Sequence, residues 1–195
     1  MITKTQLRVK RFFDLVFSIV LIPVLIIPIV LFVVVATIET KQFGLFLQKR
    51  VGQHGKLFYI FKIRTLRKEE HALGHLDMSA TTFGKFLRQY KLDELPQIFN
   101  VLVGHMGFVG PRPDVPGFAD ILEGEDRLIL KVKPGITGPA TLKYRNEEEI
   151  LSQQLDPETY NRTIIWPDKV KINKKYIDNY SFSLDLNFIL KSILN

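Results

Sequence analysis

Two adjacent carboxylates, Asp93 and Glu94, are the side chains of this sequence best suited to catalysis. They stand just before Leu95 and Pro96, where a helix is predicted to begin, so helix capping is the simplest account of them. A functional account is that one carboxylate attacks phosphorus while the other binds Mg²⁺. Carboxylates can form acyl phosphates, and Mg²⁺ prefers hard oxygen ligands. Spacing alone leaves both accounts open.

Basic side chains that suit a phosphate site occur on both sides of this pair in the sequence. They are Lys62, Arg64, Arg88, Arg112 and Arg145. The planar guanidinium group of arginine matches the oxygens of a phosphate through two parallel hydrogen bonds. Arg112 is the strongest candidate, because a proline on either side fixes its backbone. A solvated basic face is the alternative interpretation for each of these residues.

The composition narrows the class of protein. The chain has 195 residues, with 27 Lys+Arg against 20 Asp+Glu and a formal charge of +7. It contains no cysteine, which excludes disulfide scaffolds, thiolate metal sites and cysteine nucleophiles. No P-loop, dinucleotide-binding fingerprint or HExxH motif is present. The positive charge predicts an anionic partner, and the poor match to RNA-binding patterns argues against nucleic acid.

An apolar segment that could enter a membrane lies near the N-terminus. Residues 15–38 carry no charge and are numerous enough for a helix across a bilayer. Pro23 and Pro28 interrupt the segment, and Lys and Arg residues, including Lys10 and Arg11, flank both of its ends. Because such residues prefer the cytoplasmic side, a segment that enters and returns to the same face would satisfy both ends. A single spanning helix with a proline kink is the alternative.

The remaining chain predicts one mostly helical α+β unit that places the carboxylates between a hairpin and two shaped loops. Alternating β-formers predict strands at 45–51 and 57–65. Helical spacing predicts helices at 82–90 and 94–103, with further helix starts at Asn146, Asp156 and Trp166. Gly and Pro predict loops at 104–116 and 134–139. The apolar C-terminal stretch is either core or an amphipathic helix at a lipid interface.

The ordered motifs of this chain resemble those of the bacterial sugar transferases, the monotopic phosphoglycosyl transferases. The resemblance rests on Lys10-Arg11-x-x-Asp14, Gln48-x-Arg50-x-Gly52, Phe61-Lys62-Ile63-Arg64-Thr65, Leu87-Arg88, residues 92–102, residues 107–113 and residues 133–138. It covers roughly residues 8–190, and is loosest after Gly138.

The resemblance implies an activity and an arrangement of the chain. Such enzymes transfer a sugar-1-phosphate from a UDP-sugar to undecaprenyl phosphate at the cytoplasmic face of the bacterial inner membrane, and release UMP. It implies that Asp93 attacks the β-phosphorus and that Glu94 helps to hold Mg²⁺. Arg88, Arg112 and Lys62 would neutralise the phosphates, with Arg64 beside Lys62 and with Arg145 gripping the nucleotide.

The same resemblance implies a re-entrant helix-break-helix anchor over residues 1–40 and a cytoplasmic catalytic domain over residues 41–195. Its break would lie at Pro28, with Lys10 and Arg11 at the phospholipid headgroups. The catalytic domain would carry a small hairpin and interfacial amphipathic helices. A homodimer is compatible with this arrangement.

Three single positions depart from the family pattern, and the stretch at residues 143–147 differs from the family's usual Gly-Arg-Asn loop. Ile27 precedes Pro28 where the family usually has Ser, His105 replaces a usual Asp, and Asn173 also stands where an Asp is common. These departures bear on substrate preference more than on the type of reaction. A membrane-bound module that binds a lipid phosphate or a protein partner without catalysis is the alternative function.

Overall fold

The computed structural model describes residues 2–68 and 73–194, and over these residues the chain is mostly helical with two small sheets. The α-helices are α1 (Lys4–Thr40), α2 (Leu76–Ser79), α3 (Thr82–Gln89), α4 (Gln97–Val103), α5 (Pro139–Lys143), α6 (Glu147–Ser152), α7 (Pro157–Tyr160), α8 (Trp166–Asp178) and α9 (Phe182–Leu194). The strands are β1 (Leu45–Val51), β2 (Leu57–Ile63), β3 (Gly107–Val109) and β4 (Gly135–Thr137). The α+β, mostly helical prediction is confirmed at this level.

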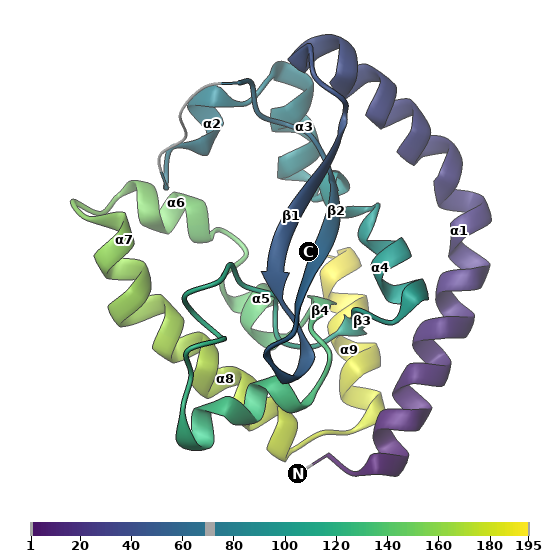
Figure 1. Cartoon of the computed structure of the whole chain (residues 1–195), viewed down its shortest axis with the longest axis vertical. Helices are drawn as coiled ribbons and strands as arrows, with labels where there is room; N and C mark the ends of the chain where they lie inside the picture. Colours follow the sequence, from purple (N-terminus) through teal and green to yellow (C-terminus); the bar gives the residue numbers. More distant parts are fainter. Residues whose placement is uncertain (1, 69–72, 195) are drawn as a thin grey trace.

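Helix α1 is long and apolar enough to cross a membrane, and it follows one side of the body (Figure 1). It is 37 residues long and continues through Pro23 and Pro28. The predicted interruption at Pro28 is therefore not an unwound break, and the ribbon arches around the body instead. Each proline removes one backbone hydrogen bond, which bends a helix without requiring that it unwind.

The β1–β2 hairpin crosses the front of the molecule and is fixed to α4 by one side chain (Figure 1). Asn100 of α4 is fully buried; its Oδ1 accepts from the Phe61 amide at 3.0 Å and its Nδ2 donates to the Tyr59 carbonyl at 2.7 Å. The amide side chain thus binds the free edge of β2 as a neighbouring strand would. This contact fixes the position of Lys62 relative to α4.

The two Gly/Pro-rich segments, predicted only as loops, meet as the parallel pair β3–β4. The amide of Gly110 donates to the Thr137 carbonyl, and the amide of Gly135 donates to the Pro111 carbonyl, both at 2.9 Å. A Cβ on Gly135 would lie 2.1 Å from the Gly110 nitrogen. Glycine is required here because the two backbones touch. The contact holds the Pro111-Arg112-Pro113 segment in place.

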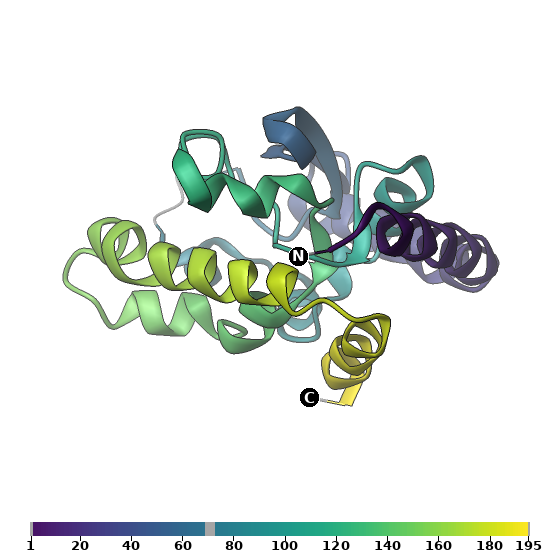
Figure 2. The same ribbon diagram turned by 90° about the horizontal axis from the view of Figure 1, so that it is seen from below.

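Helices α8 and α9 form the other wall of the core, and α9 lies beside the N-terminal part of α1 (Figure 2). The largest buried cluster combines Val170 and Ile177 of α8 with the last residues of β1 and β3, Val51 and Val109, and with Ile129 of the 3-10 helix Gly124–Lys131. Leu186, Leu190, Ile193 and Leu194 of α9 remain exposed. The apolar C-terminus is therefore an amphipathic helix whose inner face packs and whose outer face does not.

Two predicted elements differ from the structure by two residues or more at one end. The helix predicted at 94–103 is a 3-10 turn, Leu92–Glu94, followed by α4 from Gln97. Pro96 precedes α4 without a side-chain cap, so neither carboxylate caps this helix. The second strand ends at Ile63, two residues before its predicted end.

Candidate active site

Asp93 and Glu94 lie together on the 3-10 turn and are nearly inaccessible to solvent, at 5% and 6% exposure. Lys62 of β2 reaches both carboxylates, with its Nζ 3.4 Å from Asp93 Oδ2 and 3.0 Å from Glu94 Oε1. The prediction that Asp93 caps the helix is wrong, because α4 begins at Gln97 with Pro96 at its N-cap and without a side-chain cap. Burying two carboxylates is costly even when one ammonium group binds both, and such clusters are frequent at functional sites, so this pair is the candidate catalytic centre.

Arg112 completes the cluster from the other side. Its Nη1 donates to Glu94 Oε2 at 3.1 Å, and its Nη2 donates to Oε1. Burial alone would raise the pKa of Glu94, but the charges of Arg112 and Lys62 hold this pKa well below its usual value. Glu94 in turn raises the pKa of Arg112. Glu94 is therefore a carboxylate that holds two cations beside its neighbour Asp93.

The other three predicted phosphate ligands differ in what their side chains contact. Arg88 of α3 forms an ion pair with Glu148 of α6, so a carboxylate of the same chain already binds it. Arg64 donates to the Phe43 carbonyl at 2.9 Å and covers the Phe46 ring, away from the acids. Arg145 lies half-buried between α5 and α6 and makes no ion pair within residues 2–68 and 73–194.

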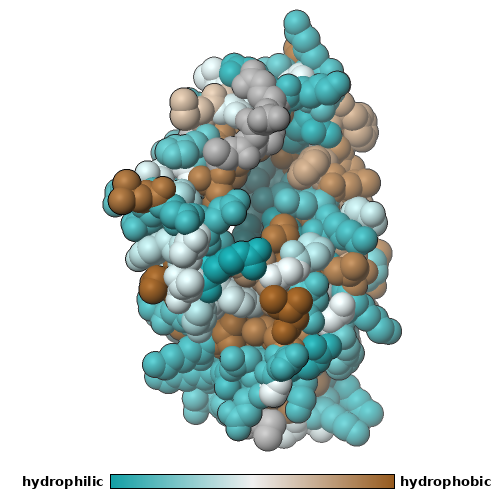
Figure 3. Space-filling model, turned by 60° about the vertical axis from the view of Figure 1, so that its left-hand side comes forward, coloured by the Kyte–Doolittle hydropathy of each residue, from teal (hydrophilic) through white to brown (hydrophobic). Residues whose placement is uncertain are grey.

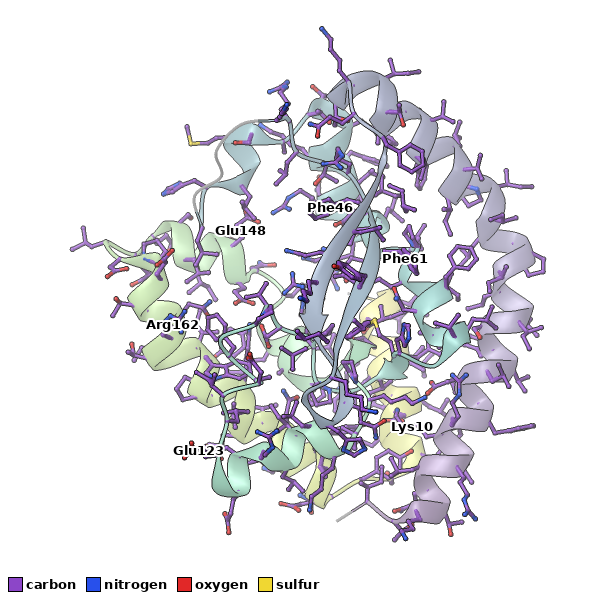
Figure 4. All side chains as sticks on the ribbon, viewed as in Figure 1. Lys10, Phe46, Phe61, Glu123, Glu148 and Arg162 are labelled. Atoms are coloured by element: carbon purple, nitrogen blue, oxygen red, sulfur yellow. The ribbon has the colours of Figure 1, made fainter. Side chains whose placement is uncertain are left out.

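Lys10 and Arg11, which were expected at phospholipid headgroups, are used inside the protein. Lys10 is 5% exposed and points from α1 to Asp185 of α9, with which it forms an ion pair (Figure 4). Arg11 donates to the carbonyls of Val101 and Leu102 at 2.6 Å and 2.9 Å. It therefore caps the end of α4, where unpaired carbonyls favour a cation. The reason for the difference is tertiary packing: α1 lies directly against α4 and α9.

A second group of charges extends the cluster and was not predicted from the sequence. Arg50 donates to Gln48 Oε1 at 2.6 Å, and burial together with the charge of Arg112 lowers its pKa to about 10. Burial raises the pKa of Asp114, which follows the proline-flanked arginine. Lys169 binds both Glu147 oxygens at 2.7 Å. Arg50 lies within a recognised motif, but nothing in the spacing indicated its link to Arg112.

The three single-residue departures from the family pattern lie apart from the carboxylate pair. Ile27 is exposed on α1, and His105 is an exposed residue whose ring lies 5.6 Å from the Phe58 ring. Asn173 is buried on α8, and its Oδ1 has no hydrogen-bond partner among the described residues. None of the three contributes a described contact to Asp93 or Glu94.

Two carboxylates could contribute to a metal site, but the described residues contain no group of three or more His, Cys, Asp or Glu that could hold a metal ion. Asp93 and Glu94 offer hard oxygens, and Mg²⁺ often binds through one or two carboxylates with waters and substrate phosphates completing its shell. The donor set thus fits Mg²⁺ if a phosphate substrate is bound.

The face that carries α6 and α7 is hollowed near its middle and mostly hydrophilic there (Figure 3).

Comparison with known families agrees with the motifs and the fold. The family described as bacterial sugar transferase matches residues 5–195. The chain belongs to this family. Because the match covers nearly the whole chain, the prediction of a bacterial sugar transferase is confirmed.

Several curated proteins are similar in sequence to this chain. The chain is 33% identical over 187 residues to the "Uncharacterized sugar transferase EpsL" of Bacillus subtilis, and the match covers 94% of this chain and 85% of that protein. It is 35% identical to a "UDP-glucose:undecaprenyl-phosphate glucose-1-phosphate transferase" of Klebsiella pneumoniae, over 94% of this chain and 39% of that protein. A "UDP-N-acetylgalactosamine-undecaprenyl-phosphate N-acetylgalactosaminephosphotransferase" of Aeromonas hydrophila is 30% identical over 95% of this chain and 43% of its own length. This chain thus spans about two fifths of the length of the last two relatives.

Proposed function

We propose that the chain transfers a sugar-1-phosphate from a UDP-sugar to undecaprenyl phosphate and releases UMP, as an early membrane step in the assembly of a polysaccharide or other glycoconjugate. The observation that carries this proposal is the buried Asp93–Glu94 pair held by Lys62 and Arg112. Relatives named for this reaction with different sugars support the reaction type and leave the sugar open.

The proposed chemistry has two steps at one phosphorus atom. An oxygen of Asp93 attacks the β-phosphorus of the UDP-sugar, a P–O bond forms, and the bond to the α-phosphate breaks so that UMP leaves. An oxygen of the lipid phosphate then attacks the same phosphorus, which releases Asp93 and leaves a lipid diphosphate sugar. Charge neutralisation by fixed cations is the main requirement of such a transfer.

Each residue of the cluster has a role in this scheme. Glu94 holds Lys62 and Arg112, so the two cations are already ordered when the diphosphate arrives. Arg88 would exchange Glu148 for a substrate phosphate. Asp93 and Glu94 would hold Mg²⁺, which would supply additional positive charge at the diphosphate.

We propose that α1 is an anchor whose two ends lie on the same side of the membrane. Its first part binds α4 and α9 through Arg11 and Lys10. Its last part returns to the same body, where Glu39 accepts from the Phe83 amide at 3.2 Å and Thr37 accepts from the Gly44 amide at 2.8 Å. A straight spanning helix would carry one end away from a body that contacts both, so a re-entrant course on the cytoplasmic face is favoured.

UMP release is the experiment that tests the reaction. The purified protein is given a panel of UDP-sugars, with and without undecaprenyl phosphate and Mg²⁺. One UDP-sugar should give lipid- and Mg²⁺-dependent UMP, and Asp93→Asn should abolish it. Full turnover by Asp93→Asn would overturn the covalent step, and no UMP with any UDP-sugar would favour the non-catalytic alternative.

The topology of α1 can be tested by cysteine labelling. The chain has no cysteine of its own, so a single introduced cysteine is the only thiol that a reagent can label. Cysteines introduced at Lys4 and at Gln53 should both react with an impermeant reagent from the cytoplasmic side only. Reaction from opposite sides would restore the single spanning helix.

A further inference from the structure

An apolar cavity of about 270 Å³ lies between the second half of α1 and the body. All of its lining side chains are apolar: aliphatic residues of α1 between positions 29 and 34 form one wall, and Leu45 with Phe43, Phe61, Pro96 and Phe99 forms the other. Figure 4 shows Phe61 on the hairpin where it faces α1 and α4. A cavity of this lining takes hydrocarbon rather than a sugar or a nucleotide.

One side of this cavity is formed by α1, the candidate membrane helix. Val30 and Val34 line the cavity and remain 54% and 50% exposed. They belong to the apolar part of α1, which is long and apolar enough to span a bilayer. A hydrocarbon chain could therefore pass from the lipid into the cavity without crossing a polar surface.

The opposite wall adjoins the carboxylate cluster. Pro96 lines the cavity and follows Glu94 by two residues, so their Cα atoms are no more than about 7 Å apart. Phe61, which also lines it, directly precedes Lys62, and successive side chains of a strand point to opposite faces. The hairpin thus presents an aromatic ring to the cavity and an ammonium group to the acids within two consecutive residues.

We infer that this cavity binds the phosphate-proximal carbons of the lipid acceptor, a single isoprenoid chain joined directly to a phosphate. The inference rests on the proposed function. A ligand that fills an apolar cavity and also reaches Lys62 or Arg112 needs its anionic group at the end of one hydrocarbon chain. A diacyl phospholipid instead joins its phosphate to a glycerol, so polar ester groups separate the phosphate from either acyl chain, and a wholly apolar lining offers these esters no hydrogen-bond partner. Only the first few carbons would enter, and the rest of the chain stays in the bilayer.

Two matched tryptophan variants test the cavity through acceptor kinetics. Val34→Trp fills it, whereas Leu31→Trp places the same side chain at an exposed α1 position outside the lining. We expect Val34→Trp to raise the KM for undecaprenyl phosphate at least about tenfold, because the buried hydrocarbon contacts are lost. Leu31→Trp should keep the wild-type KM. Equal KM values in the two variants would overturn the inference while leaving the proposed reaction intact.

Photolabelling supplies a readout that does not depend on turnover. A short isoprenoid phosphate with a diazirine on its first isoprene unit is irradiated with the full-length protein in phospholipid vesicles. Labelled peptides should contain Phe43, Phe61 or Phe99, and excess unlabelled isoprenoid phosphate should compete whereas phosphatidic acid should not. Labelling elsewhere, or equal competition by phosphatidic acid, would contradict the inference. Labelling of these peptides by a protein that uses no UDP-sugar would contradict the proposed function alone.

Discussion

The Nζ atom of Lys62 lies 3.0 Å from Glu94 Oε1 and 3.4 Å from Asp93 Oδ2, so one ammonium group binds two adjacent carboxylates. With Arg112 on the far side of Glu94, the cluster orders its cations before substrate binds. Asp93 makes no ion pair with Arg112 among the described contacts, so Lys62 is the cation nearest the proposed nucleophile. These relationships determine what each substitution should do.

Lys62→Met should lower kcat about a hundredfold, because one fixed positive charge at the transferred phosphoryl group is lost. The same charge lowers the pKa of Glu94, so its removal should raise that pKa and shift the acid limb of the pH–rate profile to higher pH. UMP release measured across pH checks both effects. Lys49→Met, at an exposed position on β1, should change neither.

Stability in acid should depend on Glu94. Its pKa is lower in the folded protein than in the unfolded chain, where it is about 4.3, so its ionised form stabilises the fold above that value. This stabilisation is lost as the pH falls through the folded-state pKa. The wild type should therefore be more stable than Glu94→Gln at pH 6, and the difference should shrink below about pH 4. Fluorescence of Trp166, the only tryptophan, reports thermal unfolding. A difference that grows in acid would contradict the prediction.

The Lys10–Asp185 ion pair should stabilise the contact between α1 and α9. Asp185 also accepts from the Tyr176 hydroxyl at 2.6 Å, and all three residues are buried. Lys10→Met should cost about 3–5 kcal/mol because it leaves a buried carboxylate without its cation. Lys10→Met combined with Asp185→Leu should cost less than the sum of the single changes.

A surface pair provides the control for this cycle. Lys174 lies 2.9 Å from Asp126, which is about half exposed, and Lys174→Met should cost under about 1 kcal/mol. Unfolding in denaturant, followed by Trp166 fluorescence, measures all of these variants. Equal losses at Lys10 and Lys174 would show that the buried pair contributes no more than a surface one.

Gly135→Ala should reduce both stability and activity. The added Cβ would meet the Gly110 nitrogen at 2.1 Å, so the β3–β4 contact must open. We expect a loss of about 1–3 kcal/mol, as for other overpacked sites, together with reduced UMP release because the Arg112 segment moves. Ile136→Val, at the adjacent position, is the control and should retain activity. Normal activity in Gly135→Ala would mean that Arg112 does not depend on this contact.

Residue types and local patterns were enough to identify the candidate catalytic side chains, the apolar N-terminal segment and most of the helices and strands. The Asp93–Glu94 pair, Lys62 and Arg112 could be selected because residue type and local spacing limit which groups can bind phosphate. The hairpin could be predicted because strand alternation and turn residues are local signals. Motif resemblance then indicated the family.

The contacts that these side chains make are apparent only in the folded chain. Lys10 and Arg11 bind groups inside the protein rather than lipid headgroups. Arg64 contacts Phe43 and Phe46, and Arg88 forms an ion pair with Glu148. The fold also joins two glycine-rich segments as β3 and β4, and places Asn100 along the edge of β2. These contacts connect positions far apart in the chain. Local residue preferences in one sequence predict helices, strands and turns, but they do not indicate which distant segments pack together.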